Sequence, residues 1–373
     1  MLRELYKLGE LNIRSRYIDN ERKKHQLIDL FWECTLTCNA RCKHCGSNAE
    51  KKKYDGELTT SEIKKAFKQI ANDMNADKIL INVTGGEPLV RSDLCEVMEY
   101  ATNNLGFHWG MTTNGILLNE ENIQKLKKAN LETISISIDG IEEMHDKFRG
   151  IPGSYKTITK NIKKLKEADF VDHIQVTTVF HKGNISQINE LYKVMQDLNV
   201  DSWRLVSMDP IGRANENNHL LLNGSEIKLI LDFIKENKNN KTVALEYGCP
   251  GYLGLKYEKE VRNHYFYCRT GINVASILYN GDLFVCPNVP RIKKMIQGNI
   301  KVDNFKYIWE NKYKEFRDKN RTTCKECSEC DQWNYCMGGA YHTWNFHENF
   351  QNKCIYKMLN KNMEEIKWKC LKN

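Results

Sequence analysis

Cysteine is the residue type in this sequence that points most strongly to metal binding or catalysis, because the chain has 14 cysteines among 373 residues. Three of them, Cys38, Cys42 and Cys45, form a C-x3-C-x2-C triplet. Three thiolates in one short loop can bind three irons of an iron–sulfur cluster and leave the fourth iron open for chemistry. A structural zinc site instead closes with four protein ligands. The triplet therefore favours a reactive iron–sulfur cluster.

A second set of cysteines lies in the C-terminal third of the chain, among glycine, asparagine and aromatic residues with little periodicity. Its members are Cys249, Cys268, Cys286, Cys324, Cys327, Cys330, Cys336 and Cys354. A region with so little apolar patterning is expected to need metal ligation to fold. Zinc is the alternative metal, because C-x2-C pairs are common in zinc modules. The other three cysteines, Cys34, Cys95 and Cys370, are predicted to be ordinary side chains.

Composition and charge narrow the setting of these thiols. The chain has 41% apolar and 28% charged residues, as an ordinary globular protein does. The N-terminus lacks the apolar run of a signal peptide, and no stretch approaches about 18 uncharged apolar residues, so we expect a cytoplasmic protein without a membrane span. The net charge of +8 is scattered without a basic block or interleaved aromatic residues, and this predicts no nucleic-acid partner.

A repeated strand-and-helix pattern positions the triplet. The predicted strands are 27–33, 78–84, 107–113, 133–139, 173–180 and 202–208. The first predicted helix follows a capping box at residues 59–62, and the others run near 92–103, 119–129, 154–168, 184–198 and 224–238. Because β-α-β crossovers are right-handed, six such units form a curved parallel sheet with helices outside. The predicted fold is therefore α/β, a partial (βα)6 TIM-like barrel followed by a cysteine-rich auxiliary domain.

These patterns divide the chain into three predicted parts. Residues 1–26 are an N-terminal extension, 27–240 the partial barrel, and 241–373 the cysteine-rich domain. The extension is too short to be a domain of its own, since chains below about 40 residues seldom fold alone.

Further motifs follow the triplet at the ends of successive predicted strands. They are Gly85-Gly86-Glu87-Pro88, Thr113-Asn114-Gly115, Ser135-Ile136-Ser137-Ile138-Asp139-Gly140 with His145-Asp146-Lys147-Phe148-Arg149-Gly150, and Pro210-Ile211-Gly212-Arg213-Ala214. Ligand sites of parallel α/β folds gather at this edge of the sheet. The triplet and these motifs, in this order, resemble the radical S-adenosylmethionine (SAM) superfamily, whose 4Fe-4S cluster binds SAM through its open iron.

The resemblance implies a set of contacts to SAM. The implied residues are Gly85, Gly86, Glu87, Thr113, Asn114, Ser137, Arg149 and Val179. In the family the GGEP motif meets the methionyl amino group, where glycines allow close backbone approach and a carboxylate suits a cation. The guanidinium of Arg149 suits the SAM carboxylate, and Val179, on the fifth strand, is placed to touch the adenine.

The second cysteine set resembles the SPASM domain, which carries one or two auxiliary 4Fe-4S clusters in radical SAM enzymes acting mainly on peptides and proteins. Its central block normally reads C-x2-C-x5-C-x3-C, but Ala340 occupies the last place here. The departure puts the first auxiliary cluster in doubt, and Cys324 is the thiol that could substitute. The implied ligands are Cys327, Cys330, Cys336 and Cys354 for one cluster, and Cys268, Cys286 and Cys324, with Cys249 as fourth candidate, for the other.

The resemblance implies a radical SAM oxidoreductase, or peptide maturase, that reductively cleaves SAM to a 5′-deoxyadenosyl radical. This radical would take hydrogen from a C–H bond of a ribosomal peptide, which is then cross-linked or dehydrogenated. The implied partners are the peptide or protein substrate, a flavodoxin- or ferredoxin-type reductase as electron donor, and a separate leader-peptide recognition protein.

Two alternatives stay open from the sequence. One is a radical SAM dehydrogenase or epimerase acting on a small molecule, of sugar or haem type. The other is a non-catalytic zinc-binding scaffold. No catalytic acid or base can be named, although Asp209, Tyr247 and Tyr279 are candidates.

Overall fold

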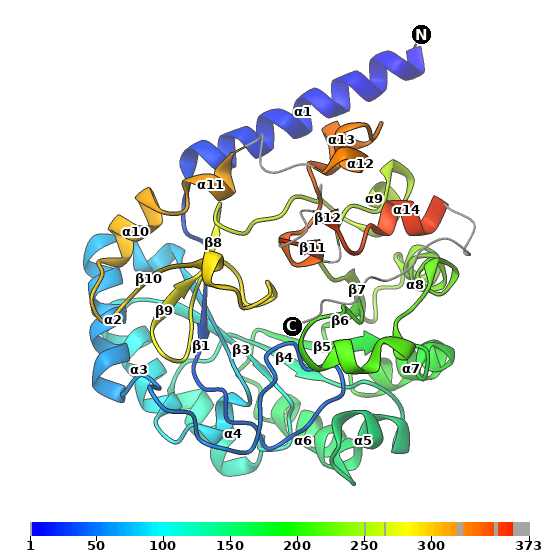
Figure 1. The fold of residues 1–373 in the computed structure, drawn as a ribbon. Coiled ribbons are helices and arrows are strands. Elements are labelled where there is room, and N and C mark those ends of the chain that lie inside the picture. The colour runs from blue at the N-terminus through cyan, green and yellow to red at the C-terminus, as the bar shows by residue number, and fades with distance from the viewer. Residues whose placement is uncertain (1, 250, 265, 319–323, 347–349, 361–373) are drawn as a thin grey trace.

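A computed structural model describes residues 2–249, 251–264, 266–318, 324–346 and 350–360. Strands form the inside of the molecule and helices surround them, while the long helix α1 (Leu2–Lys24) extends from one side of the body (Figure 1). Cys370, predicted to be an ordinary side chain, lies outside the described residues.

Ten strands form one sheet within the described residues, in the order β10-β9-β8-β1-β2-β3-β4-β5-β6-β7. They are β1 (Asp29–Glu33), β2 (Leu80–Thr84), β3 (His108–Thr113), β4 (Thr133–Ser137), β5 (His173–Phe180), β6 (Ser202–Ser207), β7 (Ala244–Tyr247), β8 (Val274–Ile277), β9 (Asp282–Phe284) and β10 (Ile296–Asn299). All pairs from β8 to β7 are parallel, and β9 and β10 continue the sheet antiparallel. The predicted α/β partial barrel is confirmed, with β1 to β6 at the six predicted strands.

The helices that follow these six strands cover the outside of the barrel (Figure 1). They are α2 (Thr60–Asp73), α3 (Leu94–Leu105), α4 (Glu120–Lys128), α6 (Ser154–Ala168), α7 (Ile188–Asp197) and α8 (Gly224–Asn237). The predicted capping box is present, since Thr59 Oγ1 accepts from Glu62 N at 3.2 Å and Thr59 N donates to Glu62 Oε2 at 2.8 Å. A further helix, α5 (Glu143–Arg149), was not expected from the sequence.

Shorter elements make up the rest of the described chain. The remaining α-helices are α9 (Leu255–Val261), α10 (Phe305–Asn311), α11 (Lys314–Arg317), α12 (Lys325–Ser328), α13 (Trp333–Cys336) and α14 (Ile355–Asn360), and β11 (Trp344–Asn345) pairs with β12 (Phe350–Gln351). The 3-10 helices are η1 (Ala76–Lys78), η2 (Pro88–Val90), η3 (Ile185–Gln187), η4 (Gly212–Leu220), η5 (Lys293–Met295) and η6 (Tyr341–Thr343).

The chain after residue 240 shares the sheet and core of the barrel. β7 extends the sheet beyond β6, and β8 pairs with β1, where Val274 faces Asp29. Ile277, Phe284 and Trp309 belong to the same apolar core as the barrel strands. The C-terminal region therefore does not depend on its cysteines alone, because strand pairing and apolar burial also hold it.

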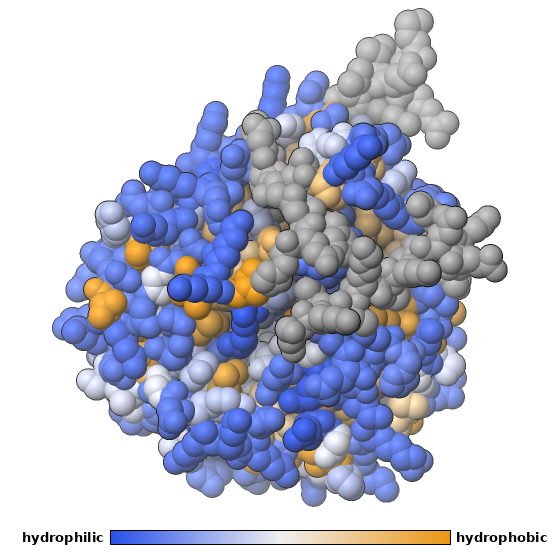
Figure 2. Space-filling view, in the orientation of Figure 1, coloured by the Kyte–Doolittle hydropathy of each residue, from blue (hydrophilic) through white to orange (hydrophobic). Residues whose placement is uncertain are grey.

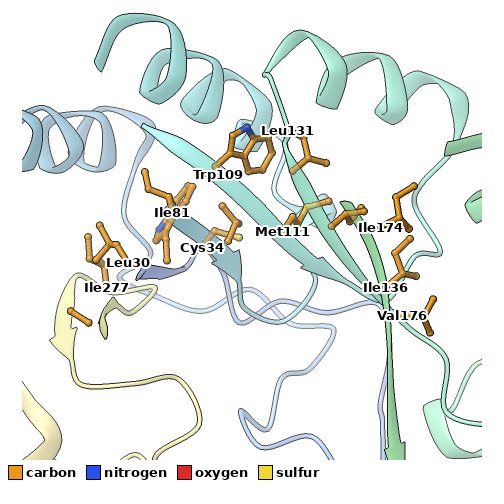
Figure 3. Close-up of a cluster of buried hydrophobic side chains, with 14 of the residues drawn as sticks. Leu30, Cys34, Ile81, Trp109, Met111, Leu131, Ile136, Ile174, Val176 and Ile277 are labelled. Atoms are coloured by element: carbon orange, nitrogen blue, oxygen red, sulfur yellow. The ribbon is translucent and has the colours of Figure 1, made fainter. Parts of the chain in front are cut away.

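Alternate residues of the strands form the core between sheet and helices. Trp109 and Ile136 point to this side with their neighbours (Figure 3), and Trp32, Trp109 and Trp203 are fully buried. The other residues of each strand point to the opposite, concave face. That face carries polar side chains, among them Ser135 and Thr177.

The surface in view is mostly hydrophilic, with apolar residues in small scattered groups (Figure 2). Among the described residues, none of the helices has the length and apolar character needed to span a membrane.

Candidate active site

The cysteine triplet lies in the loop after β1, at the carboxyl-terminal edge of the sheet. Cys38 and Cys42 are each 8% exposed, and Cys45 is half-buried. Backbone hydrogen bonds close the loop, from Cys38 N to Glu50 O at 2.8 Å and from Cys45 N to Cys42 O at 3.3 Å. The structure thus brings the three predicted ligands together.

The donor set suits an iron–sulfur cluster. Burial raises the pKa of Cys38 to about 12 and that of Cys42 above its usual range, so both stay protonated until a metal displaces the protons. Ala40 N lies 3.4 Å from Cys38 Sγ, and Arg149 Nη1 lies 3.6 Å from Cys42 Sγ. Such donors tune thiolates that hold a cluster. Among the described residues, no group of three or more His, Cys, Asp or Glu is already arranged around a metal position.

The two glycines of the GGEP motif pack the loop after β2 against the backbone leading to Cys38. A Cβ at Gly85, which has a φ of 149°, would clash with Thr35 O, and one at Gly86 would clash with Thr37 O. Gly86 N donates to Thr35 O at 2.7 Å. Glycine is needed here for a close approach of two backbones.

Glu87 lies inside the protein and is fully buried. Its carboxylate accepts hydrogen bonds from Thr113 Oγ1 at 2.7 Å, Asn114 N at 2.8 Å and Leu89 N at 3.2 Å. Burial raises its pKa. Glu87 therefore joins the ends of β2 and β3, and its contact with the methionyl group of SAM stays a prediction.

Asn114 connects the end of β3 to the cysteine loop. Its Nδ2 donates to Asn39 Oδ1 at 2.6 Å, while its Oδ1 accepts from Ile116 N at 3.0 Å. Asn39 directly follows Cys38, so this side chain steadies the first residues of the triplet. Contacts of Asn114 and Thr113 with SAM likewise stay predictions.

Arg149 forms a buried ion pair at the end of β4. Its Nε donates to Asp139 Oδ2 at 2.6 Å, and Asp139 Oδ1 accepts from Val179 N at 2.7 Å. Burial would raise the pKa of Asp139, but the Arg149 guanidinium holds it below its usual range. Arg149 thus links β4, β5 and Cys42. Its predicted contact with the SAM carboxylate, and those of Val179 and half-buried Ser137, are not tested by this arrangement.

An aromatic stack lies beside the triplet. His44 stacks on Phe148 with ring centroids 4.8 Å apart, and Phe148 stacks on His181 at 4.0 Å. Burial lowers the pKa of both histidines to about 4, so both are neutral at pH 7. His44 Nδ1 and His181 Nε2 are buried without a hydrogen-bond partner. Because buried polar atoms rarely lack partners, a molecule bound at this stack could supply one.

Arg213 is a site residue to which sequence reasoning assigned no role. Its Nε donates to Cys42 O at 3.0 Å, its Nη1 to Ala49 O at 2.9 Å, and its backbone N to Cys45 O at 3.1 Å. It therefore holds the far side of the cysteine loop. The sequence signal for Arg213 was its place in the motif after the sixth strand. Asp139, the buried partner of Arg149, was also given no role, because Asp-Gly is common in turns.

The first group of auxiliary cysteines contains Cys249, Cys268 and Cys286. Cys268 and Cys286 pack against the main core. Cys249 is exposed at the surface. Desolvation by the surrounding protein, and then the nearby Cys268 and Cys286, raise its pKa to about 12. Ala340, at the place of the missing ligand, is fully buried against Tyr252 and provides no donor. Cys249, Cys268 and Cys286 therefore lie near one another, and their role as cluster ligands stays a prediction.

Cys324 lies with the second group, which also contains Cys327, Cys330, Cys336 and Cys354. Cys324 is the N-cap residue of α12, the helix that carries Cys327, and both are buried against Trp344. Burial and then Cys324, Cys354 and Cys336 raise the pKa of Cys327. Cys324 thus lies beside Cys327, and its predicted grouping with Cys268 and Cys286 stays a prediction.

The three candidate acid and base residues have different environments. Asp209 follows β6 and accepts from Lys353 Nζ at 2.5 Å, with His342 Nε2 at 3.4 Å. Burial raises the pKa of Tyr247 to about 12. Tyr279 is half-buried, and its backbone N lies 3.5 Å from Glu33 Oε1. None of these arrangements identifies a catalytic acid or base.

Comparisons with known proteins agree with this geometry. Residues 32–195 match the profile of the radical SAM superfamily, and residues 268–331 match SPASM, an iron–sulfur cluster-binding domain. The AdoMet-dependent heme synthase of Methanosarcina barkeri is 29% identical over 87% of this chain and 95% of its own length. The mycofactocin maturase MftC of Mycolicibacterium smegmatis is 28% identical over 86% of this chain and 79% of its own.

Solved structures share the fold. Native anSMEcpe with bound AdoMet and Cp18Cys peptide superposes with a TM-score of 0.66 at 20% identity, covering 84% of this chain and 89% of that one. SuiB of Streptococcus suis bound to S-adenosylmethionine gives a TM-score of 0.65 at 17% identity, covering 86% and 75%.

The partial barrel with three cysteines at its carboxyl edge defines an iron–sulfur enzyme that uses SAM. The chain contains a radical SAM domain over residues 32–195 and a SPASM domain over residues 268–331. Its cofactors are SAM, a SAM-binding 4Fe-4S cluster and auxiliary iron–sulfur clusters. The alternative of a non-catalytic zinc scaffold is therefore wrong.

Proposed function

We propose that this enzyme oxidises a ribosomal peptide, forming a cross-link or a dehydrogenated residue. When bound, the cluster and SAM supply a 5′-deoxyadenosyl radical that takes a hydrogen atom from an unactivated C–H bond. The relationship to the mycofactocin maturase MftC supports a peptide substrate.

The position of Lys353 supports the proposal that the reaction is an oxidation. Lys353, next to Cys354, is 2% exposed, and its Nζ donates to Ser207 Oγ at 2.8 Å, Met208 O at 3.1 Å and Asp209 Oδ1 at 2.5 Å. The segment carrying a predicted auxiliary ligand is thus fixed to the carboxyl end of β6, on the edge that holds the triplet. Loss of a hydrogen atom leaves a substrate radical, and a second electron must leave for a two-electron oxidation. An auxiliary iron–sulfur cluster bound by Cys354 at this edge would accept that electron.

The residues of this chain shape and dry the reaction space. Arg213 and the Asp139–Arg149 pair fix the cysteine loop from opposite sides. Cys38 and Cys42 are each 8% exposed, which limits the access of water to these two thiols. These groups bind and orient, and none of them needs to transfer a proton.

The proposal includes partners and a location. A flavodoxin- or ferredoxin-type reductase would donate the first electron, and a separate protein would recognise the leader peptide. The thiol-rich composition fits a reducing cytoplasm.

A second candidate is an oxidation of a haem-type small molecule. It is favoured by the heme synthase relative, which is matched over 95% of its own length. A sugar-type substrate has no comparable observation in its favour.

The test uses anaerobically purified, cluster-loaded full-length protein with SAM and dithionite. Products are 5′-deoxyadenosine, measured by chromatography, and peptide mass, measured for short peptides encoded beside this chain's gene. The proposal expects 5′-deoxyadenosine and a peptide that has lost two hydrogen atoms. A triple Cys38→Ala, Cys42→Ala, Cys45→Ala variant is the control. Oxidation of an iron-porphyrin carboxylate with no change in any peptide would favour the second candidate and overturn the first.

A further inference from the structure

The concave face of the barrel carries a row of polar side chains. Strand register places Ser137, Thr177, Arg204 and Glu246 side by side across β4 to β7, and Thr112, Ser135 and Gln175 side by side across β3 to β5. We call Ser135, Gln175, Thr177, Arg204 and Glu246 the polar row.

The side of the sheet on which the row lies follows from the core. Trp203 and Leu205, which flank Arg204 on β6, are fully buried, and Trp203 packs against Tyr192 of α7 and Phe233 of α8. Side chains alternate along a strand, so Arg204 points away from the helices. The polar row therefore faces the inside of the barrel.

Solvent reaches this face at both sides of the row. Thr112 is exposed although β3 lies between two other strands. The side chains of Arg204 and Glu246 are 45% and 46% exposed. Side chains with this much solvent exposure on the inner face of a sheet can be contacted by a ligand.

The hydrogen bonds within the row leave an excess of donors. Glu246 Oε2 already accepts from Gln175 Nε2 at 3.0 Å and lies 3.6 Å from Arg204 Nη2. Ser135 Oγ and Thr177 Oγ1 are bonded to each other at 2.9 Å. A guanidinium has five N–H donors, and within the described part of the chain the side chain of Arg204 contacts Glu246. Arg204 therefore has N–H donors left, and a guanidinium binds carboxylates well.

We propose that the polar row binds the peptide substrate and that Arg204 receives a carboxylate of that peptide. The inference rests on the proposed function and adds the substrate chemistry. Peptide amides suit hydroxyl and amide side chains, whereas the flat apolar body of a tetrapyrrole needs an apolar lining. Tetrapyrroles also carry carboxylates, so the test must separate the two sources.

The experiment measures binding of three labelled synthetic nonapeptides to the cluster-loaded full-length enzyme with SAM, by fluorescence anisotropy. The peptides share a Gly/Ser/Asn sequence and have Glu, Gln or Lys at the centre. We expect the Glu peptide to bind about tenfold more tightly than the Gln peptide, as one charge-assisted hydrogen bond predicts. Arg204→Gln should abolish this preference, Arg204→Lys should retain part of it, and Arg204→Glu should favour the Lys peptide.

The matched control is Lys128→Gln, which removes an exposed cation that is 3.2 Å from Glu99 on the outside of the barrel. It should leave the preference for the Glu peptide unchanged. Equal binding of the three peptides, no binding of any, or an equal preference in Arg204→Gln would overturn the inference. Arg204-dependent binding of coproporphyrin without peptide discrimination would assign the row to a tetrapyrrole. Failure of the proposed function is distinguishable, because discrimination would then persist with no oxidised peptide formed.

Discussion

Replacing Lys353 with methionine should loosen the C-terminal segment from the barrel. The ammonium is 2% exposed and donates to Ser207 Oγ, Met208 O and Asp209 Oδ1. Removing one partner of a buried ion pair costs ~3–5 kcal/mol. We expect the lower end, about 3 kcal/mol, because the Asp209 side chain is 21% exposed and keeps His342.

The assay is hydrogen–deuterium exchange of the cluster-loaded protein, followed by mass spectrometry of the peptide that covers 350–360. A loss of about 3 kcal/mol corresponds to a roughly 150-fold larger opening equilibrium for this segment. The control is Lys312→Met at the exposed C-cap of α10, which should change nothing in this peptide. Unchanged protection in Lys353→Met would refute the reasoning. An Asp209→Asn, Lys353→Met pair should cost less than the sum of the single changes.

The sign of the pH dependence follows from Asp209. Burial would raise its pKa, but Lys353 and then His342 hold it well below the ordinary value of 3.8. A carboxyl with a depressed folded pKa contributes stability that is present above the unfolded pKa and lost as pH falls through the folded pKa. The effect of Lys353→Met should therefore be constant from about pH 6 to 8. A strong change in this interval would contradict the assignment of the effect to the Asp209 pair.

Three further outcomes are expected. Gly86→Ala places a methyl group against Thr37 O, so the reconstituted variant should lack the EPR signal of the SAM cluster. The control Gly9→Ala has no atom within 4 Å of the new methyl group and should keep the signal. A full signal in Gly86→Ala would contradict the packing argument. Asp139→Asn leaves the Arg149 charge buried without its partner, which should cost ~3–5 kcal/mol and lower the thermal midpoint, and an unchanged midpoint would show that the pair is not needed. Three cubane clusters require about twelve iron atoms per chain by metal analysis, and about eight would mean that Ala340 has cost one cluster.

Local sequence patterns were sufficient to predict the barrel. Each predicted strand combines β-branched residues with a following turn, and α2 begins at the predicted capping box because Thr59 and Glu62 bond each other. The parallel pairing of β8 with β1 could not be predicted in this way. It joins residues about 245 positions apart, such as Asp29 and Val274, and the local sequence of either strand does not predict which strand it pairs with.

The cysteine triplet could be predicted because its chemistry lies within eight residues of sequence, from Cys38 to Cys45. The supports of that loop could not. Arg213 reaches Cys42 O across 171 positions, and its place in the motif after the sixth strand does not indicate which backbone it contacts. Cys324 lies at the N-cap of the short helix α12, beside Cys327, and its grouping with Cys268 and Cys286 stays a prediction.

The motif residues of this site form hydrogen bonds and an ion pair with one another. Glu87 bonds Thr113 and Asn114, and Asp139 pairs with Arg149, all inside the protein. A buried charge that loses its partner is costly, so a substitution at any of these positions disturbs the loop that holds the cluster as well as the surface that meets SAM. Lost activity in such a variant is therefore not evidence of a lost SAM contact. Iron content must be measured beside SAM affinity, and only a variant with full iron and weakened SAM binding would identify a direct contact.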